Sequence, residues 1–394
     1  MARTRIETLE EDNIIDYSRE RGKRGSVDAP FAILVLILMT IGLIMLLSAS
    51  YARAFYEDNS PLSVFIRQLF FAALGLVIMY LVSRLSLKTL KNWSMRVLII
   101  AVALMLLVPV IGTEANGAKR WINLGLFTIQ PSEIAKISVI MAFSAMICKY
   151  KGQMKTWRYG VMPFFMILVA YAFLLYLEPH LSATIIIVLL GAALMFLGGA
   201  PLMAFVVGGA GMGGLIFLYT KLGYAADRIS AWRDPMNHES DTAYQIKQSL
   251  YSIGSGGISG VGFGESRQKY MFLPEEHNDF IFSIVCEELG YIGAITILIL
   301  FALLIIRGFW LAMHCSDRYA FLLCCGVSTL LSIQVTLNVA VVTNLIPCTG
   351  VSLPFFSYGG TALMLQLAEM GIVLGCSRDI PDKKKIMTLS RINT

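Results

Sequence analysis

The chain has 394 residues, of which 57% are hydrophobic and only 15% are charged, and its mean hydropathy is +0.69. Soluble domains rarely have this composition, so it points to a membrane protein instead. The net charge of +6 lies mainly in the segments between apolar stretches, where it orients a membrane protein, so we do not expect nucleic-acid binding.

Apolar stretches recur along the chain, each long enough for a helix to cross the hydrocarbon core of a bilayer. They predict an all-α polytopic membrane protein with about ten transmembrane helices. A large extracytoplasmic loop, 221–277, is expected between the seventh and eighth helices, because lipid does not tolerate exposed irregular backbone. The predicted spans are 30–50, 64–83, 94–112, 132–150, 160–177, 181–199, 201–220, 279–306, 319–345 and 355–377.

Lys and Arg residues gather in alternate loops and at both chain ends, which predicts the orientation of the spans. On this basis both termini are cytoplasmic, while the 112–131 and 221–277 segments face the other side. The predicted organisation is a cytoplasmic tail (1–29), a transmembrane domain (30–377) and a second cytoplasmic tail (378–394). The first apolar stretch is long enough to span and follows a long charged tail, so we expect it to stay as an anchor.

The first informative outer segment runs from 116 to 136. Pro131 and Glu133 suit the first turn of a helix, and Trp121 suits a membrane interface, which is a purely structural interpretation. Lys136 does not fit that interpretation. Glu133 and Lys136 are three residues apart and share a helix face, and an ionisable pair inside a span is costly enough to indicate a functional site.

The second informative segment contains Arg228, Arg233, Tyr244, Gln248 and Ser249, followed by a glycine-rich run. The glycines resemble a nucleotide-binding fingerprint only superficially, because no strand precedes them and no βαβ unit surrounds them. Two alternatives remain open for this run. Its backbone could pack closely against another element, which is the favoured alternative, or its N–H groups could face a phosphate.

Asp279 stands at the start of a predicted span, and two interpretations apply to it. It or Asn278 could simply cap the helix. Alternatively, Asp279 could act in a site, because further carboxylates flank it on both sides. These are Glu275, Glu276, Glu287 and Glu288. At least one of the latter two is expected to face the bundle interior or a cavity. His277 and Asp279 could also hold a divalent cation with Glu275, but scattered carboxylates with one histidine are seldom a ligand set.

Taken together, these motifs resemble the SEDS family of FtsW, RodA and SpoVE over about residues 30–377. The motifs that carry the resemblance are Gly117-Ala-Lys-Arg-Trp121, Gln130-Pro-Ser-Glu133 with Lys136, Tyr244-Gln with Gln248-Ser249, Leu273-Pro-Glu with His277 and Asp279-Phe-Ile-Phe282, Glu287-Glu-Leu-Gly290, and Leu353-Pro-Phe-Phe-Ser-Tyr-Gly-Gly360. Two positions depart from the family pattern. Pro179-His-Leu-Ser182 replaces the usual Pro-Asp-Leu-Gly, and Asn278 replaces the usual Thr.

The resemblance implies a peptidoglycan glycosyltransferase of the bacterial cell membrane that polymerises lipid II, with a closer likeness to FtsW and SpoVE than to RodA. It implies Asp279 as the catalytic base, with Glu133 and Lys136 as catalytic support. It also implies a class B penicillin-binding protein and other divisome membrane proteins as partners. The implied substrate-binding residues are Lys119, Arg120, Trp121, Arg228, Arg233, Tyr244, Gln248, Ser249, His277 and Ser357.

The residue chemistry suits that role. A carboxylate can take the proton of the attacking GlcNAc 4-hydroxyl while the donor carbon inverts. The diphosphate leaving group departs ionised and needs positive charge, from Lys136, Arg120, Arg228, Arg233 or a bound Mg²⁺ or Mn²⁺. The sequence identifies no cofactor, and a divalent cation, Mg²⁺ or Mn²⁺, stays an option. A lipid II flippase and a noncatalytic divisome scaffold are the alternative functions.

Overall fold

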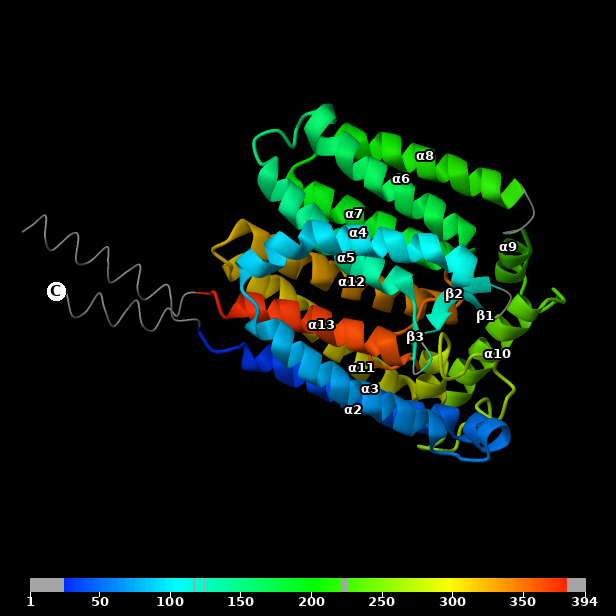
Figure 1. Cartoon of the computed structure of the whole chain (residues 1–394). Coiled ribbons are helices and arrows are strands. Elements are labelled where there is room, and N and C mark those ends of the chain that lie inside the picture. The colour runs from blue at the N-terminus through cyan, green and yellow to red at the C-terminus, as the bar shows by residue number, and fades with distance from the viewer. Residues whose placement is uncertain (1–24, 116–117, 124, 126, 222–225, 381–394) are drawn as a thin grey trace, which may run out of the picture.

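The computed structural model describes residues 25–115, 118–123, 125, 127–221 and 226–380. Long helices run side by side through one bundle, and short elements cover one of its ends (Figure 1). The predicted tails lie largely outside the described residues, as does part of the Gly117 motif and of the 221–277 segment. The long helices are α2 (Ala29–Asp58), α3 (Ser63–Arg84), α4 (Leu87–Ile111), α5 (Pro131–Lys149), α6 (Met162–Leu177) with a π-turn before it (Trp157–Val161), α7 (Leu181–Gly198), α8 (Leu202–Lys221), α11 (Ile281–His314), α12 (Arg318–Val342) and α13 (Gly360–Ser377).

The all-α polytopic fold is confirmed. Within the described ranges, nine helices are long and apolar enough to cross a membrane, and α8 contributes a shorter apolar stretch, Leu202–Gly211. The number of about ten spans stays a prediction. Several helices begin or end beyond the predicted limits, and polar side-chain caps account for some of the earlier starts. For example, α4 begins at Leu87, where the Ser86 hydroxyl accepts the Thr89 N–H at 3.0 Å.

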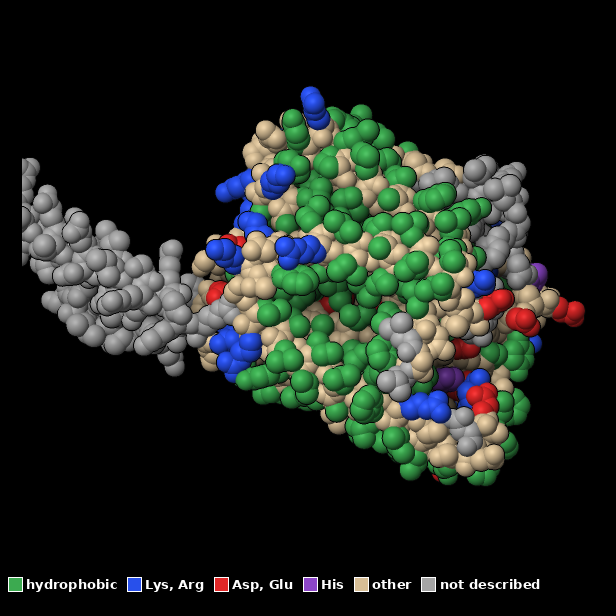
Figure 2. Space-filling view, in the orientation of Figure 1, with side chains coloured by type: hydrophobic (Ala, Val, Ile, Leu, Met, Phe, Trp, Pro, Cys, Tyr) green, Lys and Arg blue, Asp and Glu red, His purple; other side chains and the backbone are tan. Residues whose placement is uncertain are grey.

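The middle of the bundle consists of α5, α12 and α13, whose side chains are mostly buried, whereas α3 and α4 expose most of theirs. Figure 2 shows the resulting surface, a broad hydrophobic belt between two ends that carry the charges. Hydroxyl groups also bond neighbouring helices to one another across the interior. The Ser138 and Tyr171 hydroxyls, for example, are 2.6 Å apart between α5 and α6.

Both ends of the described chain lie at the same end of the bundle. The Gly25 N–H donates to the Arg378 carbonyl at 2.9 Å, and the Asp28 N–H donates to the Ser377 hydroxyl at 3.1 Å. Arg307 of α11 also binds Asp28 there, with Nη2 2.6 Å from Oδ2. The assignment of this end to the cytoplasm stays a prediction from the Lys and Arg pattern.

The opposite end carries regular structure that the sequence did not predict. Three short strands form a small antiparallel sheet in the order β1 (Thr113–Ala115), β2 (Ala118–Asn123) and β3 (Thr128–Ile129). The 221–277 segment, expected as irregular backbone, contains α9 (Ala226–Arg233) and α10 (Asp241–Gly256). The Ser240 hydroxyl caps α10 by accepting the Ala243 N–H, and α10 then buries every third residue, a spacing that the polar composition concealed: Ala243, Ile246, Ser249 and Ser252.

The glycine-rich run packs its backbone against the start of α11. Gly260 has a φ of +81°, and a Cβ on it would lie 2.1 Å from the Glu288 carbonyl oxygen. The Val261 and Gly262 N–H groups donate to the carbonyls of Glu287 and Glu288 at 3.0 and 3.1 Å. The structure therefore corresponds to the close-packing alternative, since these N–H groups are already used.

Candidate active site

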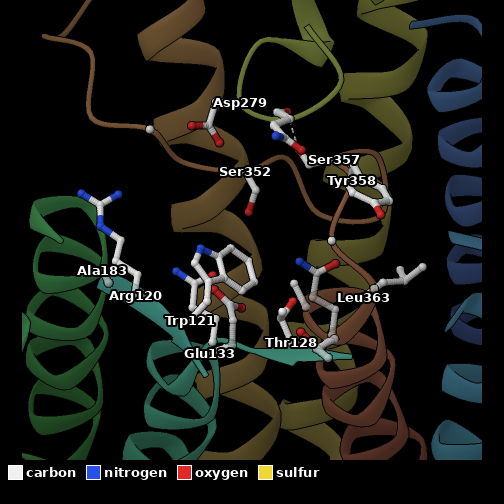
Figure 3. Close-up of a pocket in the computed structure, with 18 of the residues that line it drawn as sticks. Arg120, Trp121, Thr128, Glu133, Ala183, Asp279, Ser352, Ser357, Tyr358 and Leu363 are labelled. Atoms are coloured by element: carbon white, nitrogen blue, oxygen red, sulfur yellow. Dashed lines mark hydrogen bonds between the residues drawn. The ribbon is translucent and has the colours of Figure 1, made fainter. Parts of the chain in front are cut away.

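A cavity of about 640 Å³ opens at the end of the bundle that carries the sheet and α10. Figure 3 shows its walls, which come from β2, α5 and α13 and from the segments that precede α11 and α13. Charged and hydrogen-bonding side chains line much of it, unlike the lipid-facing surface of the bundle. They include Arg67, Arg120, Glu133, Lys136, His180, Glu275, Asn278, Asp279, Gln334, Ser357 and Gln366.

Asp279 lies on the cavity wall immediately before α11. Asn338 of α12 holds its backbone, because the Asn338 Nδ2 donates to the Asp279 carbonyl at 2.8 Å and to the Val351 carbonyl at 2.7 Å. The N-cap of α11 is Phe280, and no side chain caps that helix. The helix-capping interpretation of Asn278 and Asp279 is therefore wrong, and the Asp279 carboxylate is available to the cavity.

The surroundings of Asp279 raise its pKa to about 6. Burial is the largest cause, and the neighbouring Glu275 carboxylate adds to it, while Arg120, His277 and Arg228 act in the opposite direction. At neutral pH the carboxylate is ionised and yet is a better proton acceptor than an ordinary aspartate.

Arg120 and Trp121 lie across the cavity from Asp279. In Figure 3 they are labelled below Asp279, on the same side as Glu133. Both come from β2. The Arg120 Nε donates to the Glu178 carbonyl at 3.2 Å, and its Nη2 donates to the Pro179 carbonyl, so the α6–α7 turn fixes the guanidinium. These contacts fix the orientation of the guanidinium at the cavity wall.

Glu133 and Lys136 form the buried pair that their spacing predicted. The Lys136 Nζ is 2.7 Å from the Glu133 Oε2, and both side chains line the cavity. Glu369 is buried on the adjacent α13 and interacts electrostatically with both. Glu133 and Lys136 thus form a charged pair at the edge of the apolar interior, where charges persist only when paired.

Ser357 lies on the same wall as Asp279 and fixes the loop before α13. Its hydroxyl donates to the Asn278 carbonyl at 2.7 Å and accepts the Leu353 N–H at 2.7 Å. Gln68 of α3 supports the same loop by donating to the Ser357 carbonyl at 3.3 Å. Ser357 therefore joins the 353–357 segment to the segment that bears Asp279.

The remaining predicted substrate-binding residues lie outside the cavity lining. Lys119, Arg233 and Tyr244 are exposed, on β2, α9 and α10 respectively. Gln248 is half-buried on α10. Ser249 is buried, and its hydroxyl bonds the Ser283 hydroxyl and the Val342 carbonyl, which makes it part of the packing between α10 and α11.

Two further predicted residues lie close to Asp279 without lining the cavity. His277 is buried, with its Nδ1 3.5 Å from the Glu276 carboxylate. Arg228 donates to the Cys348 carbonyl at 3.2 Å, and its positive charge acts to lower the pKa of Asp279. Their influence on Asp279 is electrostatic.

Sequence reasoning missed several residues of the cavity wall. Arg67, Gln334 and Gln366 each interrupt an apolar span, which is the signal that could have identified them. His180 was noted only as a departure from the family pattern. It lines the cavity, and burial lowers its pKa to about 3, helped by the charges of Arg120 and Lys136, so its imidazole is neutral.

The divalent cation stays a prediction. Across the described residues, no three His, Cys, Asp or Glu side chains come together as a metal-ligand set. Asp279 and Glu275 both line the cavity, so a cation there would depend on these two carboxylates together with oxygens of a bound substrate.

Comparison with known proteins matches residues 29–380 to the FtsW, RodA and SpoVE family, described as "Cell cycle protein". The chain is 37% identical over 359 residues to "Stage V sporulation protein E" of Bacillus subtilis, which covers 90% of this chain and 98% of that protein. It is 35% identical over 355 residues to "Probable peptidoglycan glycosyltransferase FtsW" of Coxiella burnetii, covering 89% and 95% of the two chains.

Two solved structures share the fold. The crystal structure of the rod shape determining protein RodA of Thermus thermophilus superposes with a TM-score of 0.67 at 28% identity, covering 90% of this chain and 98% of that one. A chain from the structure described as "Structural coordination of polymerization and crosslinking by a peptidoglycan synthase complex" superposes with a TM-score of 0.74 at 26% identity, over 90% and 98% of the two chains.

Proposed function

We propose that this chain, which belongs to the FtsW, RodA and SpoVE family, polymerises lipid II in the cavity that Asp279 lines. Its relatives named as peptidoglycan glycosyltransferases identify it as an enzyme of that class. Its described apolar helices identify it as a multi-pass membrane protein. The observation that carries the proposal is the layout of the cavity. A carboxylate with a raised pKa lies on one wall, and two cationic side chains, Arg120 and Lys136, lie on others.

In the proposed step, the 4-hydroxyl oxygen of the acceptor GlcNAc attacks C1 of the donor MurNAc. Asp279 accepts the hydroxyl proton as the new C1–O bond forms. The bond between C1 and the diphosphate oxygen breaks, and undecaprenyl diphosphate leaves with the electron pair. A single displacement of this kind inverts the configuration at C1, because the nucleophile attacks the face opposite the leaving group.

Arg120 and Lys136 provide the positive charge that the leaving diphosphate requires. Arg120 is pre-oriented by the carbonyls of the α6–α7 turn, so little reorganisation is needed when negative charge develops. Glu133 holds the Lys136 ammonium in place, at 2.7 Å. A divalent cation beside Asp279 and Glu275, if one is bound, would supply further charge at the diphosphate.

The proposed site faces the extracytoplasmic side, where the donor lipid and the growing glycan lie. The sheet, α9 and α10 cover the end of the bundle opposite the described chain ends, which supports this orientation together with the Lys and Arg pattern. We propose a class B penicillin-binding protein as the crosslinking partner. The similar chain from a peptidoglycan synthase complex supports a polymerase that works beside a crosslinking enzyme.

Purified protein incubated with labelled lipid II tests the function. Glycan strands that disappear in the Asp279→Asn variant are the expected result. Transfer of lipid II between leaflets without polymer would instead indicate a flippase, and neither activity, with or without the cognate transpeptidase, would indicate a scaffold. Either of these two outcomes overturns the proposal.

A further inference from the structure

We propose that Arg53 is a positioning residue for Asp279, because its guanidinium clamps Glu276 and fixes the segment that carries the catalytic carboxylate. This inference rests on the proposed role of Asp279. Arg53 lies on α2, far from Asp279 in the sequence, and neither Arg53 nor Glu276 lines the cavity. Neither residue is among the charges that shift the pKa of Asp279, so we infer that the pair acts through the geometry of the segment.

The Arg53–Glu276 contact is bidentate. The Arg53 Nε is 2.8 Å from the Glu276 Oε1, and its Nη2 is 3.0 Å from the Oε2. The Glu276 side chain is completely buried, whereas that of Arg53 is 22% exposed. A paired fork of this kind fixes both the position and the orientation of a carboxylate, and a buried carboxylate cannot find water as a substitute.

Glu276 belongs to a tight turn, 275–280, that is hydrogen-bonded within itself and to the loop before α13. The Phe280 N–H donates to the Glu275 carbonyl at 3.2 Å, and the His277 carbonyl accepts the Tyr358 N–H at 2.9 Å. The backbone of Glu275 has a φ of +58°, a left-handed value that residues other than glycine rarely adopt. Such a conformation persists only when its surroundings hold it, and the Arg53 clamp on the next residue supplies that restraint.

A second pair in the same protein provides a matched control. Arg307 binds Asp28 with the same fork, Nε to Oδ1 at 3.1 Å and Nη2 to Oδ2 at 2.6 Å. It joins the N-cap of α2 to α11, at the end of the bundle opposite the cavity. The two pairs therefore share their chemistry and each fastens one end of α2, and they differ in their distance from Asp279.

The experiment compares four variants in the full chain with lipid II. Arg53→Lys and Arg307→Lys keep the charge and lose the fork. The double variants R53M/E276Q and R307M/D28N remove both charges, so that no buried carboxylate is left unpaired. We expect both Arg53 variants to lower kcat by about 10-fold or more with KM changed less than about 2-fold, since small displacements of a reacting group cost rate more than binding. Both Arg307 variants should retain the wild-type kcat.

Hydrogen–deuterium exchange gives a readout that does not depend on activity. The amides of 275–280 should exchange faster in the Arg53 variants and remain protected in the Arg307 variants. If wild-type protein makes no polymer, the proposed function fails, while the exchange still decides whether Arg53 holds the segment.

The inference is overturned by any of three results: equal kinetic losses in the two sets, an Arg53 effect confined to KM, or unchanged exchange over 275–280. If R53M/E276Q does not accumulate in the membrane, the kinetics and exchange of Arg53→Lys alone test the inference, because this variant retains the charge and loses only the fork.

Discussion

The Lys136 ammonium lies 2.7 Å from the Glu133 carboxylate on the first two turns of α5, and both side chains line the cavity that contains Asp279. Only 3% of the Lys136 side chain and 12% of that of Glu133 are exposed. A charged pair in so confined a place must be accounted for by structure or by chemistry, and its position on the cavity wall favours chemistry.

Lys136→Met separates these two explanations, because it keeps the length and apolar stem while removing the charge. We expect polymerisation to fall by about 10-fold or more, as when a fixed electrostatic partner of a developing charge is lost, while membrane accumulation changes less. Lys269→Met is the matched control, since Lys269 forms a buried pair with Glu288 at 3.1 Å outside the cavity lining. Normal turnover by the Lys136→Met molecules that do accumulate would make the pair structural.

Asp279→Asn tests the general base. The amide keeps the size of the side chain but cannot accept the proton, so polymerisation should fall by about 10²-fold or more. Turnover close to wild type would remove Asp279 from the catalytic role.

The same variant should be at least as stable to heat as the wild type. Folding raises the pKa of Asp279 from 3.8 to about 6, so the ionised carboxylate destabilises the folded state. That destabilisation is absent when the pH is below the unfolded-state pKa of 3.8 and complete when the pH is above the folded-state pKa of about 6. Thermal unfolding at pH 7 should therefore favour Asp279→Asn, with the difference disappearing in acid. A variant less stable than wild type at pH 7 would contradict this account.

The pH dependence of polymerisation should have an acidic limb near the Asp279 pKa of about 6, with activity lost as the carboxylate is protonated. Glu275→Gln removes a negative charge that raises this pKa, so the limb should move to lower pH. The amide oxygen can still accept the hydrogen bond from Asn278. Rates measured across the acidic range for both proteins check the shift, and an unmoved limb would assign it to another group.

Arg120→Lys should weaken the reaction because a lysine ammonium lacks the planar fork that spans the Glu178 and Pro179 carbonyls. We expect a loss of about 10-fold or more in kcat/KM for lipid II. Lys119→Met, one residue away and exposed outside the cavity lining, is the control and should remain close to wild type. Equal losses in both variants would point to the strand as a whole and not to the guanidinium.

The sequence by itself determined the polytopic helical fold, since hydropathy over about 20 residues is a local property that the bilayer reads directly. It also determined the Glu133–Lys136 pair, because a separation of three residues fixes two side chains on one helix face. The prediction that Asp279 is the catalytic base came from its position at the start of a predicted span and from the family resemblance. These conclusions required only near neighbours in the chain or recognisable motifs.

Only the tertiary structure decided which residues share the cavity. Arg120 reaches it because carbonyls of the distant α6–α7 turn hold its guanidinium, whereas Ser249 is drawn into the contact between α10 and α11. The pKa of Asp279 depends on burial and on Glu275, and the fork between Arg53 and Glu276 joins residues far apart in the chain. Contacts of this kind follow from how helices pack, and no local pattern in a single sequence encodes the packing of one span against another.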